Sequence, residues 1–399
     1  MARNMLDAAM ADRDEMIRHR RYLHAHAETG FDLDRTLSYV RDQLAEKGIE
    51  AKVCGRCGLT AEIGRGGRKI LLRADMDALP VREESGEDFA CRDGAMHACG
   101  HDMHTAMLLE AAKLLKEREN ELGGRVQLMF QSAEEILQGA ADMLENGLMD
   151  NGRPDAALMI HVLTGMPLEP GTVIVSSPGI SAPAAGMFEI RLQGKGCHGA
   201  MPHTGVDPIS AAAHLVLGLQ TLTSREIAPS DTAMLTIGML QAGDTANVIP
   251  DRAALRGSLR AMDDGVFAHL RTRMEEISRL TAQTFRCTAE VEMLGGCPTL
   301  MNDASTSAMA LRSVRQLLGA EKAMLSGEMG GSAARSSGSE DFAYISHEVP
   351  SVMLALAAGR PEDGYAYPAH HPMTRFDERA LPVGAAVYAQ TAADFLAQA

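Results

Sequence analysis

The spacing of apolar residues predicts alternating helices and buried strands through the first part of the chain. An apolar position every third or fourth residue predicts a helix, and a short unbroken apolar run predicts a buried strand. We expect helices over 5–25, 34–48, 104–119 and 138–147, and strands over 69–75, 125–132 and 155–161. This alternation predicts an α/β domain with a mostly parallel sheet flanked by helices.

The pattern changes near residue 186, where apolar and polar residues begin to alternate. Such alternation is typical of strands with one face in solvent. We expect a strand, a helix, two strands, a helix and a strand, over 187–194, 207–223, 233–240, 254–260, 264–284 and 286–293. The simplest packing of this order is a small sheet with two helices on one face, which is a ferredoxin-like α+β domain.

Helices and buried strands return after residue 298, with 351–356 as a late core strand. The second domain is therefore predicted to be inserted into the first, and 399 residues suit two domains. We predict a catalytic domain in 1–185 and 298–399, and an inserted lid or dimerisation domain in 186–297. The Gly- and Ser-rich stretch 327–341 is predicted to be a loop at the rim of the site.

Composition narrows the classes of function. No run of 18 apolar residues occurs, so no membrane span is predicted, and a net charge of -15 argues against a nucleic-acid partner. The N-terminal residues resemble an amphipathic helix and not a signal peptide, and seven cysteines suit a reducing compartment. The CxxC pair Cys54 and Cys57 lacks the second pair that a zinc site needs. We expect a cytoplasmic enzyme.

Residues that bind metals collect where predicted strands end or a helix begins. The stretch MHACGHDMH (96–104) precedes a helix, pairs of acids follow two strands, and a histidine ends a third. The carboxyl ends of strands in an open α/β sheet form the edge where ligands bind. The candidate residues at this edge are Asp75, Asp77, Cys99, His101, Glu134, Glu135 and His161, with His370 and His371 in a late loop.

This set of residues predicts two divalent metal ions bridged by a water or hydroxide. A metal pair about 3.5–4 Å apart lowers the pKa of the water and stabilises a tetrahedral intermediate. Carboxylates, imidazoles and a thiolate suit manganese, zinc, cobalt or nickel. One carboxylate must remain off the metals to transfer the proton, and the adjacent Glu134 and Glu135 can divide these two roles.

A series of motifs extends the pattern over nearly the whole chain. RADMDALP, MHACGHDMH, FQSAEE, IHV, CHGAMPHTGVDPI, TANVIPD, GSEDF and HHP occur in this order. With these motifs the chain resembles the amidohydrolase branch of the dinuclear aminoacylase and carboxypeptidase superfamily. That branch includes hippurate hydrolases, N-acyl-amino-acid amidohydrolases and indole-acetyl-amino-acid hydrolases. Ala27 and Ser132 stand where the family usually has proline, and neither is a proposed ligand.

The resemblance implies a role for each matching residue. The implied metal ligands are Cys99, His101, Glu135, His161 and His370, although spacing alone does not separate His370 from His371. Glu134 matches the general base, and Asp77 matches a carboxylate that orients the site. In the inserted domain, His198 matches a histidine that stabilises the oxyanion in a neighbouring subunit. Asn247 matches a polar contact to the substrate, and Arg260 is a candidate partner for the substrate's carboxylate. His104 is expected to cap or pack at the helix start.

We therefore predict a metal-dependent amidohydrolase that cleaves N-acyl or N-aroyl amino acids. Action of His198 in trans implies a homodimer or a tetramer. The alternatives within this class are a dipeptidase and an N-acetyldiaminopimelate deacetylase. An alternative from another class is a protein that binds acyl-amino acids without hydrolysing them. Glu134 argues against a pure binder, which needs no carboxylate off the metals.

Overall fold

The computed structural model describes residues 4–329 and 338–397, and the chain groups into two compact units. The second unit consists chiefly of Ala182–Leu300, and the first is built from the chain on either side of it. The insertion predicted over 186–297 lies within the second unit. Of the predicted rim loop, residues 330–337 lie outside the described residues. Each unit has its own apolar core.

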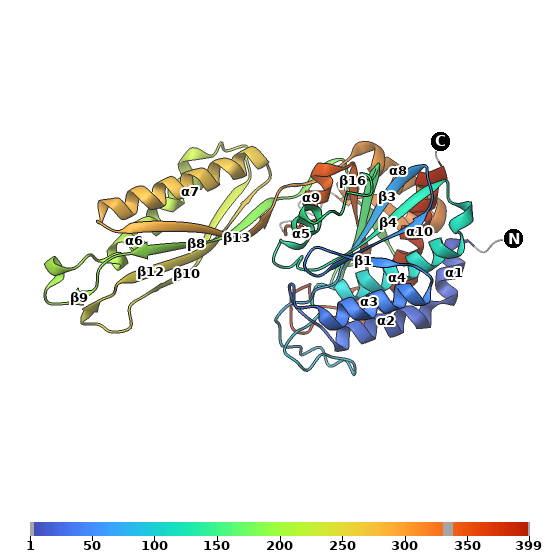
Figure 1. Ribbon diagram of the computed structural model, residues 1–399, viewed down its shortest axis with the longest axis horizontal. Helices are drawn as coiled ribbons and strands as arrows, with labels where there is room; N and C mark the ends of the chain where they lie inside the picture. Colours follow the sequence, from blue (N-terminus) through green and yellow to red (C-terminus); the bar gives the residue numbers. More distant parts are fainter. Residues whose placement is uncertain (1–3, 330–337, 398–399) are drawn as a thin grey trace. The chain divides into compact units, whose positions relative to one another are not determined.

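An eight-stranded sheet with the order β1-β2-β4-β3-β5-β16-β6-β15 forms the centre of the first unit (Figure 1). Strands β4, β3, β5 and β16 run parallel, whereas β1 and β2 form an antiparallel edge that the sequence did not predict. The strands of the first unit and its border are β1 Ala51–Cys54, β2 Gly58–Gly64, β3 Arg68–Asp75, β4 Gly124–Gln131, β5 Ala156–Leu163, β6 Val173–Val175, β7 Gly179–Ala182, β14 Leu300–Asn302, β15 Ala323–Leu325 and β16 Ser351–Ala357.

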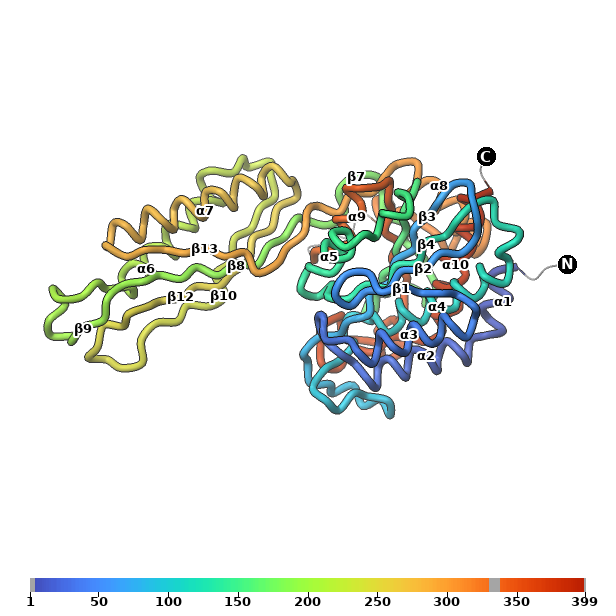
Figure 2. The backbone as a smooth tube through the Cα atoms, in the orientation of Figure 1, coloured from blue at the N-terminus to red at the C-terminus, as the bar shows by residue number. Residues whose placement is uncertain are grey.

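Alternating side chains on β4 show which helices cover each face of this sheet. Leu128 and Phe130 pack in one core with α4 and α10, whereas the amide of Gln127 donates to the backbone of Leu148, just after α5 (Figure 2). Helices α4 and α10 therefore lie on one face and α5 on the other. The helices are α1 Met5–Ala11, α2 Arg13–Ala25, α3 Asp34–Glu46, α4 His101–Glu117, α5 Gly139–Glu145, α8 Ala304–Leu318, α9 Ala343–Glu348 and α10 Leu381–Ala397. Among the described helices, none combines the length and apolar character needed to span a membrane.

Strands β3 and β5 separate toward their carboxyl ends. Their last paired residues are Arg73 and Met159, yet β3 continues to Asp75 and β5 to Leu163. The separation opens the edge of the sheet where an α/β fold binds ligands.

The second unit is a four-stranded antiparallel sheet with the order β10-β12-β8-β13 and two helices. Buried Phe188, Ile190 and Leu192 alternate along β8 and pack in one core with residues of α6 and α7. This is the predicted order of strands and helices, and β10 and β13 are its edges. The elements are β8 Ala184–Gln193, β9 Cys197–His198, α6 Pro208–Thr221, β10 Ala233–Ala242, β11 Val248–Ile249, β12 Arg252–Ala261, α7 Asp264–Thr284 and β13 Thr288–Cys297.

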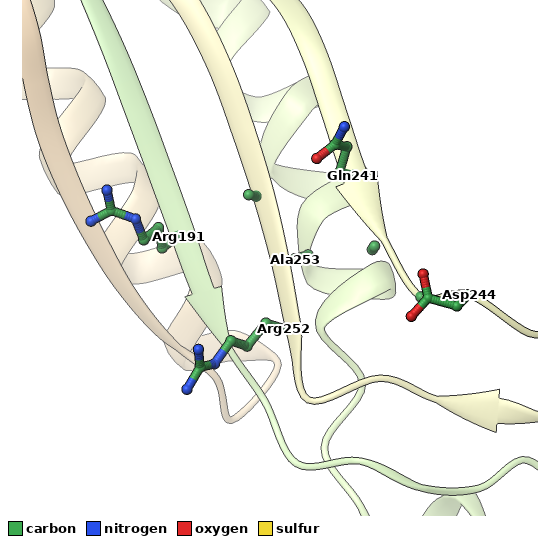
Figure 3. A pocket seen from close by; sticks show the side chains of 8 residues that line it. Arg191, Gln241, Asp244, Arg252 and Ala253 are labelled. Atoms are coloured by element: carbon green, nitrogen blue, oxygen red, sulfur yellow. The ribbon is translucent and has the colours of Figure 1, made fainter.

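The second unit contains a cavity of about 640 Å³ between the ends of β8, β10 and β12. Figure 3 shows Arg191, Gln241 and Arg252 around it. Arg191 already pairs with Glu189 and Glu292, so its charge is balanced within the sheet. None of the predicted site residues lines this cavity.

Candidate metal centre

Gly100 brings the first turn of α4 against the end of β5. It has a φ of 87°, a left-handed conformation that glycine adopts without strain. A Cβ at this position would lie 2.4 Å from Cγ2 of Val162, so no larger residue fits. The helix begins at His101, which corrects the predicted start at residue 104. Cys99 and His101 are thereby placed beside His161 on β5.

The structure brings all five predicted metal ligands into one cluster together with Glu134. Within the cluster, the Sγ atom of Cys99 lies 3.4 Å from Nε2 of His161. Nε2 of His370 lies 3.6 Å from Oε2 of Glu135. The cluster consists of overlapping groups whose ligand atoms lie within 4.8 Å of one another: Cys99 with His101 and His161, Cys99 with Glu135 and His370, and His101 with Glu134 and Glu135.

Two of these ligand atoms have no hydrogen-bond partner among the described residues, and a third has only another proposed ligand as its partner. Nδ1 of His101 donates to the backbone oxygen of Asp77 at 2.8 Å, which leaves its buried Nε2 unpaired. Nδ1 of His161 donates to the backbone oxygen of Val162 at 2.7 Å, and Nε2 faces Cys99. Oε1 of Glu135 is also buried and unpaired. Because a buried lone pair without a partner is costly, these atoms suit cations.

The electrostatics of the cluster also favour bound cations. Burial raises the pKa of the Cys99 thiol to about 12 and that of Glu135 to about 7. Burial likewise raises the pKa of Glu134 far above its usual range, with Glu340 and Asp341 adding to the effect. A divalent cation would stabilise the thiolate and the carboxylates and so reverse these shifts. The residues present therefore fit the two divalent ions that the sequence predicts.

Asp77 orients the two adjacent glutamates. Its carboxylate accepts the backbone N–H of Glu134 at 3.0 Å and that of Glu135 at 3.1 Å. Its backbone oxygen accepts the hydrogen bond from His101 described above. Oε2 of Glu134 lies 4.0 Å from Nε2 of His101, so this carboxylate reaches the edge of the cluster.

The structure separates the two adjacent histidines of the late loop. His370 has a left-handed φ of 69°, and its backbone N–H donates to the oxygen of Ala98 at 2.9 Å. This conformation places its ring beside Glu135. The ring of His371 instead stacks on Tyr367 with centroids 4.5 Å apart. His370 is therefore the histidine that joins the cluster.

A second set of buried acidic and basic residues lies next to this cluster, and the sequence did not identify it as a unit. The guanidinium of Arg73 donates to Asp75 at 2.7 Å, to Glu340 at 2.8 Å and to Asp341 at 3.1 Å. Asp75 also accepts a hydrogen bond from Nδ1 of His104 at 2.5 Å. We call these five residues the Arg73 network. The motifs RADMD and GSEDF include four of its five residues, but the sequence does not show that these residues pair with one another.

The predicted substrate contacts of the inserted unit fall into two places. His198 on β9 pairs with Val248 on β11, and the backbone oxygen of Asn247 accepts the N–H of Gly199 at 2.8 Å. Arg260 lies at the far end of β12, eight residues beyond Arg252. At about 3.3 Å per residue, this corresponds to roughly 25 Å. The structure therefore brings His198 and Asn247 together and leaves Arg260 apart.

The fold and the cluster define a metal-dependent hydrolase with an inserted α+β domain. Residues 71–394 match Peptidase family M20/M25/M40, and the chain belongs to this family. It is 36% identical over 371 residues to an N-acetyl-L-cysteine deacetylase of Bacillus subtilis, covering 92% of this chain and 85% of the relative. It is also 36% identical over 392 residues to the IAA-amino acid hydrolase ILR1-like 2 of Arabidopsis thaliana, covering 96% of this chain and 85% of that one.

A solved structure shows the same fold. The YXEP protein of Bacillus subtilis, described as a dinuclear metal-binding peptidase of the M20 family, superimposes with a TM-score of 0.76. It is 32% identical, and the match covers 97% of this chain and 99% of that one. The predicted family, fold class and metal-dependent hydrolysis of amides are thereby confirmed. The metal's identity and the role of each residue stay predictions.

Proposed function

We propose that the protein hydrolyses the amide bond between an acyl or aroyl group and the nitrogen of an amino acid, using two divalent metal ions. The observation that carries this proposal is a cluster with unpaired ligand atoms and one further carboxylate, Glu134, at its edge. The substrate class is supported by two relatives, one named as an N-acetyl-L-cysteine deacetylase and the other as an IAA-amino acid hydrolase.

The metal-holding residues in this proposal are Cys99, His101, Glu135, His161 and His370. Two divalent ions at these residues would polarise the scissile carbonyl and activate the attacking water. Glu134 accepts the proton from the water and donates it to the leaving amine. Asp77 keeps Glu134 in place through the backbone N–H that it binds. Manganese, zinc, cobalt and nickel all suit these ligands.

We further propose that the enzyme works as a homodimer or tetramer in which His198 stabilises the oxyanion of a neighbouring subunit. Arg252 and Arg260 lie roughly 25 Å apart along β12, by the strand spacing of about 3.3 Å per residue. His198 and Asn247 follow and precede the strand ends at Gln193 and Arg252, which pair with each other, so they lie at the end of the sheet opposite Arg260. No small acyl-amino acid spans that distance. If all three residues contact substrate, one inserted unit therefore serves two different substrates, which requires a second subunit.

The edge strand β10 offers a surface for that second copy. A shallow, open pocket of about 550 Å³ lies between β10 and α6, and apolar residues that include Leu217, Ile237 and Leu240 line it. Leu217 is 70% exposed, and β10 has no strand neighbour on its outer side among the described residues. An unpaired edge beside exposed apolar side chains favours strand addition.

The direct test of the activity is amine release from N-acetyl, N-benzoyl and N-indole-acetyl amino acids. The protein is stripped with a chelator and assayed before and after addition of manganese or zinc. We expect release that depends on the added metal. Release from dipeptides alone, or from N-acetyldiaminopimelate alone, would instead identify a dipeptidase or a dedicated deacetylase. No release from any of these compounds with metal bound would contradict the proposed substrate class.

The test of action in trans is to mix two inactive variants. His198→Ala and Glu134→Gln subunits are refolded together, and mixed dimers are isolated by two different tags. Each mixed dimer contains one site with an intact Glu134 and an intact partner histidine. We expect activity to return in the mixed dimer. If isolated mixed dimers remain as inactive as the parents, His198 does not act across an interface.

A further inference from the structure

Two side chains take the place of a missing strand neighbour where β5 separates from β3. The backbone N–H of Ile160 donates to the hydroxyl of Tyr388 at 2.8 Å, and that of Val162 donates to Nε2 of His104 at 2.8 Å. The Tyr388 hydroxyl in turn donates to the backbone oxygen of Arg73 at 2.6 Å. The end of β5 thus keeps its hydrogen bonds while the sheet opens.

The hydrogen bonds of His104 fix its tautomer. A backbone N–H can only donate, so Nε2 of His104 must carry a lone pair toward Val162. The proton therefore resides on Nδ1, which donates to Oδ1 of Asp75 at 2.5 Å. Oδ2 of Asp75 is held by Arg73 at 2.7 Å. All three side chains are buried, so solvent does not compete for these bonds.

His104 also packs against His161, which lies between Ile160 and Val162 on β5. The two rings meet edge to face with centroids 4.7 Å apart. His161 directs Nε2 toward Cys99 at 3.4 Å. His104 therefore constrains His161 in two ways. It accepts the backbone N–H of the next residue, Val162, and its ring packs against the ring of His161.

We propose that His104 is a positioning residue for His161, held in its tautomer by Asp75 and Arg73. It acts by fixing the end of β5 and the direction of the His161 ring. This inference rests on the proposed metal-holding role of His161. Loss of a partner that orients a metal ligand typically weakens metal binding about 10- to 100-fold.

The test compares three substitutions that remove different bonds. In His104→Asn the shorter amide can still donate to Asp75 but does not reach Val162. In His104→Gln the longer amide can still accept from Val162. Tyr388→Phe is the matched control, because it removes the side-chain acceptor of the Ile160 N–H, together with the bond to the oxygen of Arg73, without touching His161. The readouts are metal dissociation constants by chelator competition, the visible spectrum of the cobalt-loaded protein, and the melting temperature of the metal-free protein.

We expect His104→Asn to weaken the binding of one metal by about 10- to 100-fold and to change the cobalt spectrum. His104→Gln and Tyr388→Phe should keep the wild-type affinity within about threefold, although both lower the melting temperature. Unchanged affinity in His104→Asn, or an equal loss in Tyr388→Phe, would overturn the proposal. If His104→Asn does not fold, His104→Ala replaces it, and unchanged affinity there has the same consequence.

One further variant separates this inference from the proposed ligand set. His161→Ala should lose one metal outright. If it keeps both metals, the proposed role of His161 as a ligand is wrong, and the positioning role of His104 is wrong as well. If His161→Ala loses a metal while His104→Asn keeps both, only the positioning role of His104 is wrong.

Discussion

The metal cluster and the Arg73 network use the same kinds of residue but differ in how their atoms are occupied. In the cluster, Nε2 of His101 and Oε1 of Glu135 are buried without a hydrogen-bond partner among the described residues, and they lie 3.9 Å from each other. In the network, both ring nitrogens of His104 and both oxygens of Asp75 are hydrogen-bonded. The groups Asp75 with His101 and His104, and Glu134 with Glu340 and Asp341, also have their atoms within 4.8 Å of one another.

Proximity alone therefore does not identify a metal site. His104 has both nitrogens hydrogen-bonded to groups outside the proposed ligand set, so it has no lone pair left for a cation. His101 has an unpaired Nε2, and Nε2 of His161 faces only Cys99, another proposed ligand. In the network, the positive charge of Arg73 instead pairs with the carboxylates of Asp75, Glu340 and Asp341. The comparison assigns metal binding to the cluster and positioning to the network, and the first three of the following predictions each test one side of that assignment.

Glu134→Gln should have the largest effect. The amide cannot accept a proton, so we expect kcat to fall by about 10²- to 10⁴-fold. Metal content should stay at the wild-type value, because Glu134 is not among the proposed ligands. The measurement is steady-state kinetics together with metal analysis of the same preparation. Loss of metal in this variant would move Glu134 from the role of base to that of ligand.

Arg73→Met should destabilise the first unit. The substitution leaves Asp75, Glu340 and Asp341 buried without their cation, and breaking a buried ion pair typically costs about 3–5 kcal/mol of unfolding free energy. Arg191→Met is the control: this arginine also pairs with glutamates but on the exposed sheet of the second unit, where little change is expected. Chemical denaturation measures both variants. Equal, small effects would mean that the network does not stabilise the fold.

Cys99→Ser should weaken metal binding. Serine keeps the shape but offers a much weaker ligand than a thiolate, so we expect the affinity for at least one metal to fall by more than about 100-fold, beyond the range of an outer-sphere partner. Isothermal titration of the metal-free protein gives the affinity. Cys57→Ser is the matched control, because Cys57 is equally buried but lies outside the cluster. Unchanged affinity in Cys99→Ser would remove Cys99 from the ligand set.

A third buried set, on α2 and α4, predicts a smaller and pH-dependent effect. Although burial lowers the pKa of His24, hydrogen bonds to Asp102 at 2.9 Å and to Glu83 at 3.1 Å outweigh it and raise the pKa to about 9. Because this folded-state value exceeds the usual 6.5, protonated His24 stabilises the fold fully below pH 6.5. That contribution, on the order of 2–3 kcal/mol, is lost as the pH rises through about 9.

The measurement is the unfolding free energy of the metal-free wild type and of His24→Gln between pH 6 and pH 10. The difference between the two proteins should be largest at pH 6 and should shrink steadily as the pH rises. A difference that does not depend on pH would show that His24 contributes through packing and not through its charge.

Local patterns in the sequence predicted the main helices and strands of both units, and the family resemblance implied the residues of the metal cluster. Strand ends, glycines and motif letters place Cys99, His101 and His161 at one edge of a sheet. The start of α4 was placed three residues late, since the pattern does not reveal the left-handed turn at Gly100. The antiparallel edge β1–β2 was missed because its short strands lack a strong apolar run.

The Arg73 network could not be predicted because it depends on long-range pairing. Arg73 and Glu340 are 267 residues apart, and Tyr388 is 315 residues from the backbone oxygen that it binds. Residue types alone cannot distinguish His104 from His101. The two differ in whether Nε2 has a hydrogen-bond partner, which His104 has and His101 lacks. Only the three-dimensional hydrogen bonding separates a ligand from the residue that positions it.

The most direct test is a crystal structure of the metal-loaded enzyme with anomalous data collected at the absorption edge of the bound metal. We predict two anomalous peaks per subunit, both bounded by Cys99, His101, Glu135, His161 and His370, and none within the Arg73 network. A peak coordinated by His104, or by Glu340 and Asp341, would contradict the assignment of metal binding to the unpaired atoms.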